Sequence, residues 1–213
     1  MLFEDRKDAG KLLGELLKER IREKVDLVLG VPRGGVVVAQ EVAKALGAPL
    51  SLLIVRKLGV PSNPELAFGA VDPDGNLYLD QFTVSYFRLN QQDIEKVAQE
   101  ELKKIKERRE RFLKGKEPEV KDRTVLVVDD GVATGQTIIA GIGYLRKRGA
   151  KKVIVAVPVC PKDTQEKLKN YADEFYCYHA VEGSPFAVGM FYRDFRQVED
   201  EEVEKLLRES AKL

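Results

Sequence analysis

Short apolar runs alternate with amphipathic segments along most of this chain. The runs are nearly continuous in hydrophobic residues, which is typical of strands buried on both faces of a parallel sheet. They predict strands over residues 25–31, 50–55, 124–128, 153–159 and 174–180. Elsewhere apolar residues recur three or four positions apart, as on one face of a helix. This spacing predicts helices over residues 9–21, 36–46, 136–148, 163–171 and 200–213.

Residues 59–90 interrupt this alternation. The tetrapeptide Asp72-Pro-Asp-Gly75 is a strong turn signal and predicts a hairpin between residues 67–71 and 77–81. Irregular stretches of this length are uncommon in compact domains unless they cover or bind something. We therefore expect residues 59–90 to form a hairpin insertion that covers or binds something.

A long charged helix is expected to follow, with Asn90 as its cap and its end near Gly115. Its basic and acidic residues are interleaved, which favours a solvated helix face over a nucleic-acid patch.

The alternation of strands and helices predicts an α/β fold. We expect an open, mostly parallel twisted sheet with helices on both faces and right-handed crossovers. A length of 213 residues fits a single domain, residues 1–213, with a tail helix at its C-terminal end. In such sheets ligands bind beyond the carboxyl ends of the strands, where the strand order reverses.

Composition narrows the function classes. With 44% hydrophobic residues the chain can bury a core, and no apolar run is long enough for a membrane span. A formal net charge of +1 argues against a nucleic-acid binder. The first residues carry no apolar leader, so we expect a cytoplasmic protein. Cys160 and Cys177 form no CxxC pair, and we expect them, like His179, to be packed structural residues.

The segment after strand 124–128 carries the most specific chemistry. The strand delivers two carboxylates, Asp129 and Asp130, and a turn then opens directly into a helix. Main-chain N–H groups in such a turn, together with the helix dipole, favour an anion. The turn consists of Gly131, Val132, Ala133, Thr134, Gly135, Gln136 and Thr137. A sugar phosphate suits both parts, with its phosphate in the turn and its hydroxyl groups, or a divalent metal, on the carboxylates.

Three other sites with similar parts fit less well. A P-loop requires a lysine after its last glycine, and none follows Gly135. A dinucleotide fold requires GxGxxG after the first strand, but Gly141-Ile-Gly143 lies inside a predicted helix. A receiver domain also has paired acids at strand ends, but they lie on early strands and lack the Gly/Thr turn.

The stretch VLVVDDGVATGQT resembles the phosphoribosyl-pyrophosphate motif of the type I phosphoribosyltransferases, which is a hydrophobic strand, two acids and x-x-Ala/Thr/Asp-Thr-Gly-x-Thr/Ser. The resemblance implies that Asp129 and Asp130 hold the ribose hydroxyls and that Ala133 to Thr137 hold the 5′-phosphate. It further implies phosphoribosyl pyrophosphate as a substrate, Mg²⁺ as a cofactor with Asp129 and Asp130 as its ligands, and a homodimer. From the same resemblance we expect residues 59–90 to be a flexible hairpin that acts as a lid, and residues 181–213 to form a small C-terminal hood with the tail helix.

Two further loops carry candidate phosphate ligands. Arg33 offers a charge-assisted fork, and Gly34 and Gly35 allow the backbone to approach a ligand closely. The family binds pyrophosphate at the corresponding loop. Arg56 and Lys57, after the next predicted strand, form a second cationic pair that we expect at the same edge.

The acceptor is less well defined. Phe186, Val188 and Gly189 match a Phe-x-Val-Gly segment of hypoxanthine-guanine phosphoribosyltransferases, in which the phenylalanine stacks on the purine. The metal-binding acid of that family does not match, because Arg193 occupies its position and Asp194 comes one residue later. Ala133 replaces the acid of the oxopurine enzymes, as in enzymes resembling adenine phosphoribosyltransferase, and alanine cannot act as a general base.

These features predict transfer of a 5-phosphoribosyl group to a small-molecule nitrogen nucleophile, with Asp129, Asp130 and Arg33 as catalytic residues. The alternative is a non-catalytic regulator that senses phosphoribosyl pyrophosphate or a nucleotide. Hydrolysis of a sugar phosphate is a weaker third reading, because the sequence contains no evident group to activate water.

Overall fold

The computed structural model describes residues 2–183 and 185–211. It divides into two compact units. The first contains residues 1–53, 118–134 and 148–213, and the second contains residues 54–117 and 135–147. The predicted tail helix is observed as α7 (Asp200–Ala211), and residues 212 and 213 lie outside the described part of the chain.

The first unit is built on a five-stranded sheet. Every pair of neighbouring strands is parallel. The spatial order is β2 (Leu50–Leu52), β1 (Leu27–Gly30), β6 (Thr124–Val128), β7 (Lys152–Pro161) and β8 (Glu174–Val181). This sheet confirms the predicted α/β fold. Strand β2 is shorter than predicted, because the chain leaves the sheet after Leu52.

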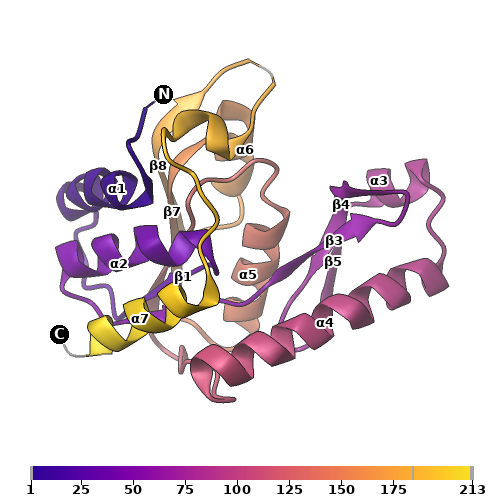
Figure 1. The fold of residues 1–213 in the computed structure, drawn as a ribbon, viewed down its shortest axis with the longest axis horizontal. Helices are drawn as coiled ribbons and strands as arrows, with labels where there is room; N and C mark the ends of the chain where they lie inside the picture. Colours follow the sequence, from indigo (N-terminus) through magenta and orange to yellow (C-terminus); the bar gives the residue numbers. More distant parts are fainter. Residues whose placement is uncertain (1, 184, 212–213) are drawn as a thin grey trace. The chain divides into compact units, whose positions relative to one another are not determined.

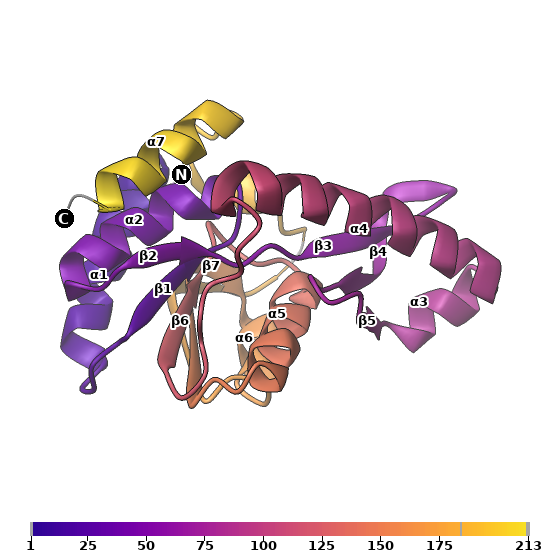
Figure 2. The same ribbon diagram turned by 90° about the horizontal axis from the view of Figure 1, so that it is seen from below.

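Helices cover both faces of this sheet. Helices α1 (Arg6–Arg20) and α2 (Gly34–Leu46) pack on one face, and α6 (Lys162–Leu168) lies on the other (Figure 2). Alternate strand residues such as Val28, Leu126 and Ile154 form one buried cluster with apolar residues of α1 and α2. All residues of β1 and β6 are buried, which explains their continuous apolar runs.

Helix α7 packs against α2 in the same unit (Figure 1). Its Val203 and Leu206 are buried, and its first turn is acidic. A short three-ten helix, η1 (Val188–Phe191), belongs to the C-terminal hood.

The strand order reverses between β1 and β6. From β1 the chain passes through α2 to β2 on one side, whereas β7 and β8 extend the sheet on the other side of β6. Gly30, the last residue of β1, is paired with Val128, the last residue of β6. The loops that leave these two strands therefore begin side by side, at the place where open α/β sheets bind ligands.

The second unit contains a three-stranded antiparallel sheet formed by β3 (Arg56–Val60), β4 (Asn63–Val71) and β5 (Leu77–Leu79). Strands β4 and β5 confirm the predicted hairpin, and its turn is held by Asp72, whose Oδ1 accepts from the main-chain N–H of Asp74. Arg56 and Lys57 begin an antiparallel strand, so their prediction as the end of a parallel strand is wrong.

Three helices complete the second unit: α3 (Gln81–Tyr86), α4 (Gln91–Leu113) and α5 (Gln136–Lys147). The predicted cap of α4 is confirmed. Asn90 and Asp93 form a reciprocal capping box, in which each side chain accepts from the other's main-chain N–H. Helix α3 was not predicted, because its residues lie in the stretch expected to be irregular.

The three residues expected to be packed differ in their exposure. Cys160 is buried and Cys177 is half-buried. His179 is exposed, and its ring centroid lies 6.1 Å from that of Phe191, so its prediction as a packed residue is wrong. It lies on β8, which is an edge strand of the sheet and leaves part of its surface to solvent. Of the helices in the described residues, none combines the length and apolar composition that a membrane span requires.

Candidate functional site

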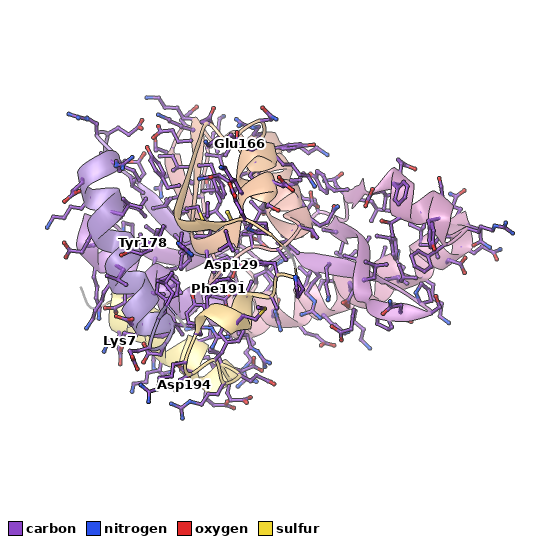
Figure 3. The ribbon with its side chains drawn as sticks, turned by 90° about the horizontal axis from the view of Figure 1, so that it is seen from above. Lys7, Asp129, Glu166, Tyr178, Phe191 and Asp194 are labelled. Carbon is purple, nitrogen blue, oxygen red and sulfur yellow. The ribbon has the colours of Figure 1, made fainter. Side chains whose placement is uncertain are left out.

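Two adjacent carboxylates, Asp129 (labelled in Figure 3) and Asp130, come directly after β6, at the carboxyl edge of the first unit's sheet. Oδ1 of Asp129 accepts a hydrogen bond from the main-chain N–H of Asp130 at 2.8 Å. Oδ2 of Asp130 accepts from Nε of Arg6 at 2.9 Å. Oδ2 of Asp129 and Oδ1 of Asp130 take part in neither of these two bonds. Each acid therefore keeps one oxygen for a ligand.

Charge is concentrated at this pair. Burial and then the neighbouring charge of Asp130 raise the pKa of the Asp129 carboxyl well above its ordinary value, while the Arg6 guanidinium acts in the opposite direction. A ligand that donates hydrogen bonds or carries positive charge would relieve the repulsion between the two acids. The site thus favours hydroxyl groups or a cation at this position.

The glycine loop after β1 packs directly against these acids. A methyl group on Gly35 would lie 2.7 Å from Oδ1 of Asp129 and 3.0 Å from its Cα, and one on Gly34 would lie 2.6 Å from Nε of Arg6. Only glycine fits at either position without displacing the acid pair. The sequence predicted the two loops separately, and the pairing of β1 with β6 brings them together.

Arg33 precedes these glycines and adjoins the start of α2. Its Nη1 lies 3.4 Å from Oδ1 of Asp200, in the first turn of α7. Both side chains are partly exposed, so the guanidinium has access to solvent. The peptide bond between Pro32 and Arg33 is cis.

The turn after the acids is supported by two neighbouring elements. The N–H of Val132 donates to the carbonyl oxygen of Val159 on β7 at 3.1 Å. From α6, Thr164 Oγ1 donates to the carbonyl oxygen of Ala133 at 2.6 Å, and Lys167 Nζ donates to that of Thr134 at 3.3 Å. These carbonyl groups are bonded within the protein. Sequence reasoning missed Thr164 and Lys167, which carry no motif.

The chain passes from the first unit to the second between Thr134 and Gly135. Gly135 has φ +88°, a left-handed conformation that favours glycine, and α5 begins at the next residue, Gln136. The predicted phosphate contacts of Gly135, Gln136 and Thr137 stay predictions.

Arg56 and Lys57 also belong to the second unit. Nη2 of Arg56 pairs with Oε1 of Glu101 on α4 at 3.3 Å, whereas Lys57 is exposed. Their predicted role as a second cationic pair of the site stays a prediction.

Arg6 is the main residue of the site that sequence reasoning missed. It lies at the start of α1, its Nη1 donates to the carbonyl oxygen of Arg196 at 2.7 Å, and its guanidinium lies 4.0 Å from the ring centroid of Phe195. It is separated from Asp130 by 124 positions. No local pattern in the sequence connects the two.

The hood meets the acid loop through Tyr192 and Val188. The hydroxyl of Tyr192 donates to the main-chain carbonyl oxygen of Asp130 at 2.6 Å, and a methyl group on Gly131 would lie 2.6 Å from Cγ1 of Val188. Burial, and then the charge of Asp130, raise the pKa of the Tyr192 hydroxyl above its ordinary value, so it remains a hydrogen-bond donor.

The aromatic residues predicted for the hood are half-buried. Phe186 lies beside Phe191, with their ring centroids 5.4 Å apart, and both pack against the cluster that contains Phe3. Asp194 is exposed and pairs with Arg196 at 3.0 Å (Figure 3). Its side chain is therefore engaged at the surface, which agrees with the mismatch to the metal-binding acid noted in the sequence.

Comparison with known proteins gives the site its context. The family model described as a phosphoribosyl transferase domain matches residues 3–190. The chain belongs to this family. The match includes both loops at the sheet edge and the first part of the hood, up to residue 190.

Two curated relatives from Mycobacterium tuberculosis, in strains CDC 1551 / Oshkosh and ATCC 25618 / H37Rv, carry names that assign them provisionally as phosphoribosyl transferases. Each is 45% identical over 203 residues, which cover 95% of this chain. The chain spans only 45% of the length of each relative.

Solved structures agree with the fold. The crystal structure of TT1426 from Thermus thermophilus is 42% identical, with a TM-score of 0.79, over 98% of this chain and 99% of that one. The AQ2163 protein from Aquifex aeolicus is 12% identical, with a TM-score of 0.51, over 83% of this chain and 75% of that one. The second likeness concerns the fold alone.

Proposed function

We propose that this phosphoribosyl transferase domain moves the 5-phosphoribosyl group of phosphoribosyl pyrophosphate to a nitrogen nucleophile, most simply a nucleobase, and releases pyrophosphate. The observation that carries the proposal is the direct packing of the Gly34–Gly35 backbone against Asp129 and Asp130 at the reversal of strand order. This arrangement supplies hydrogen-bond acceptors for a sugar next to a loop suited to phosphate oxygens.

In this proposal each acid binds one ribose hydroxyl. Oδ2 of Asp129 and Oδ1 of Asp130 are the oxygens that remain after the bonds to the Asp130 N–H and to Arg6. Two adjacent carboxylates with one available oxygen each match the 2′,3′-diol of a ribose. The 5′-phosphate is assigned to the turn from Gly131 to Thr137, whose expected ligands are main-chain N–H groups and threonine hydroxyls.

The pyrophosphate is assigned to the loop of Arg33, Gly34 and Gly35. The glycines let main-chain N–H groups approach the oxygens, and the guanidinium of Arg33 can form two parallel charge-assisted hydrogen bonds. Arg33 would exchange its 3.4 Å contact with Asp200 for these oxygens.

The reaction requires the C1–O bond of the sugar to break, with its electron pair leaving on pyrophosphate. The lone pair of the acceptor nitrogen forms the new bond to C1. A nitrogen that carried a proton releases it to water. Positive charge develops on the sugar ring, so the two nearby carboxylates stabilise the transition state and fix the sugar's orientation.

The donor set fits Mg²⁺ carried by the substrate. Carboxylate oxygens are ligands that Mg²⁺ accepts, and it commonly combines one or two of them with substrate phosphates and water. Within the described residues, no group of three or more His, Cys, Asp or Glu side chains could hold a metal by itself. Asp129 and Asp130 would therefore be partial ligands, and bound Mg²⁺ would neutralise the leaving pyrophosphate.

The hood is the proposed acceptor region. Phe186 and Phe191 offer half-buried aromatic faces on which a planar base could stack. Alanine cannot act as a general base, so Ala133 cannot remove a proton from the acceptor. The acceptor nitrogen must therefore be nucleophilic without help from that residue.

The test is incubation of the protein with phosphoribosyl pyrophosphate, Mg²⁺ and a panel of nucleobases, with release of pyrophosphate as the readout. We expect release that depends on one class of base. Asp129→Asn and Asp130→Asn should each lower turnover by at least about 100-fold, because each removes negative charge that faces the cationic sugar. Tight binding without base-dependent release would contradict the transferase proposal and favour a sensor.

A further inference from the structure

Arg6 makes contacts that an ordinary surface arginine at the start of a helix does not need. Its Nε donates to Oδ2 of Asp130 at 2.9 Å, its Nη1 donates to the carbonyl oxygen of Arg196 at 2.7 Å, and its guanidinium faces the ring of Phe195 at 4.0 Å. Only 12% of its side chain is exposed, and only 16% of that of Asp130. The guanidinium is thus held in one orientation by three different partners.

Pairing between the chain's N-terminal segment and the hood places Arg6 in this position. The N–H of Phe3 donates to the carbonyl oxygen of Phe191 at 2.9 Å, and the N–H of Arg193 donates to that of Phe3 at 2.8 Å. One residue further along, the N–H of Asp194 donates to the carbonyl oxygen of Glu4 at 2.9 Å. Helix α1 then begins at Arg6, with Asp5 as its cap. The site's arginine therefore comes from a segment that precedes the first strand.

Arg6 donates its hydrogen bond to only one of the two carboxylate oxygens of Asp130, Oδ2. Because Arg6 occupies Oδ2, the carboxylate cannot rotate freely, and Oδ1 is the oxygen left for a ligand. Gly34 allows this arrangement, since a methyl group there would lie 2.6 Å from Nε and 2.9 Å from Nη2 of Arg6. The glycine loop thus leaves room for the arginine.

We infer that Arg6 is a positioning residue for sugar binding: it fixes the carboxylate of Asp130 so that Oδ1 accepts a ribose hydroxyl. This role rests on the proposed function, because it deepens the assignment of Asp130 to the ribose. Arg6 acts through Asp130 and does not itself touch the sugar. Lysine could keep the charge, but it has no planar fork with which to bind Asp130 and the Arg196 carbonyl together.

Binding of ribose 5-phosphate, measured by calorimetry in the presence of EDTA, tests this role without metal or turnover. The variants are Arg6→Met, Asp130→Asn and the double variant, with Arg193→Met as the matched control. Arg193 lies in the same hood but is 70% exposed and pairs with Glu4 at the surface. Melting curves verify that each variant folds, and Arg6→Lys serves where Arg6→Met does not fold.

We expect Arg6→Met and Asp130→Asn each to weaken binding about tenfold, the size expected for a charge-assisted hydrogen bond. Because both changes act on one contact, the double variant should bind no more weakly than Asp130→Asn. Arg6→Lys should fall between the wild type and Arg6→Met, and Arg193→Met should bind like the wild type.

Two results would overturn the role of Arg6 alone. One is unchanged binding by a folded Arg6→Met or Arg6→Lys variant when the wild type binds. The other is a double variant whose loss equals the product of the two single losses, since Arg6 would then act independently of Asp130. A wild-type protein that does not bind ribose 5-phosphate would contradict the proposed function, and the role of Arg6 with it.

Discussion

The hydroxyl of Tyr192 is bonded to the main-chain carbonyl oxygen of Asp130 at 2.6 Å, across 62 positions of sequence. Tyr192 is 2% exposed, and its ring lies near those of Phe3 and Phe195, with centroid distances of 5.2 Å and 4.9 Å. The hood is therefore attached to the backbone of the acid pair itself. We therefore expect changes in the hood to alter ligand binding at the proposed sugar site.

Tyr192→Phe should weaken both the fold and ribose 5-phosphate binding. The substitution keeps the ring but leaves the Asp130 carbonyl without its partner, which costs about 1 kcal/mol and lowers Tm by about 2–4 °C. Thermal melting and calorimetry measure the two effects. Tyr178→Phe, in a ring that is 39% exposed, is the control and should change neither. Identical behaviour of the two variants would contradict the proposed coupling.

Gly35→Ala should abolish sugar-phosphate binding. The added methyl group would lie 2.7 Å from Oδ1 and 3.0 Å from Cα of Asp129, so the acid must move. Gly47→Ala is the control, because a methyl group at Gly47 meets no atom within 4 Å. Its φ of +64° still makes alanine unfavourable, by about 1 kcal/mol. We expect the control to melt at a lower temperature but to bind like the wild type. Equal binding by both variants would show that the close approach has no role.

Asp129→Asn should make the protein more stable at neutral pH while it lowers activity. The pKa of Asp129 is raised in the folded state, so its charge destabilises the fold above that raised pKa. Below the unfolded pKa of about 3.9 both states are protonated and the effect disappears. Melting curves should therefore show a gain of a few degrees at pH 8 that vanishes near pH 4.

Asp194→Asn is the matched control for that experiment. Asp194 is an exposed acid in the hood, and this variant should melt like the wild type at both pH values. If Asp129→Asn were less stable than the wild type at pH 8, its charged form would be favourable in the fold, against the expectation.

The charge cluster around Lys152, the first residue of β7, should show the opposite pH dependence of stability. Lys152 Nζ contacts Oε1 of Glu23 at 2.6 Å and also pairs with Glu174. Burial alone would raise the pKa of Glu174, but hydrogen bonds from Lys152 and Tyr176 outweigh it and lower that pKa. The cluster's stabilisation is therefore complete above the unfolded pKa of about 4.3 and is lost as pH falls through the lowered folded pKa.

Lys152→Met should consequently reduce the free energy of unfolding at pH 7 by about 0.5–1 kcal/mol, with a smaller difference at pH 3. Denaturant unfolding at both pH values measures it. Lys162→Met removes an exposed pair with Glu182 and should have no measurable effect. A difference for Lys152→Met that grows toward pH 3 would contradict the direction of the Glu174 shift.

The elements predicted best are those whose pattern is set by local burial. Strand β6 has the predicted bounds, because an unbroken apolar run is what burial on both faces requires. The apolar run over residues 50–55 led to a strand prediction that is too long, for a related reason. Leu53, Ile54 and Val55 are as buried as strand residues, but the chain has left the parallel sheet after Leu52. Burial is visible in the sequence, whereas the choice of a pairing partner is not.

His179 and Asn90 show the same difference between what the local sequence determines and what strand pairing determines. His179 lies among residues of a strand pattern, but β8 is an edge strand and leaves it exposed. The cap of α4 at Asn90 is within reach of sequence analysis, since the capping box that the structure shows joins residues only three positions apart. Contacts between residues a few positions apart in the sequence follow from residue propensity and spacing. The solvent exposure of an edge strand follows from the order of strands in the sheet.

For the proposed site, the sequence by itself determined the two acids after a buried strand, the turn that follows them and the glycine loop after β1. Each is a local arrangement that the chain specifies over a few residues. Only the tertiary structure decided that β1 and β6 are neighbours, with Gly30 beside Val128, and that Arg6 reaches Asp130. Those relationships depend on the strand order, on the strand register and on where the N-terminal segment packs. All three arise from packing of the whole unit.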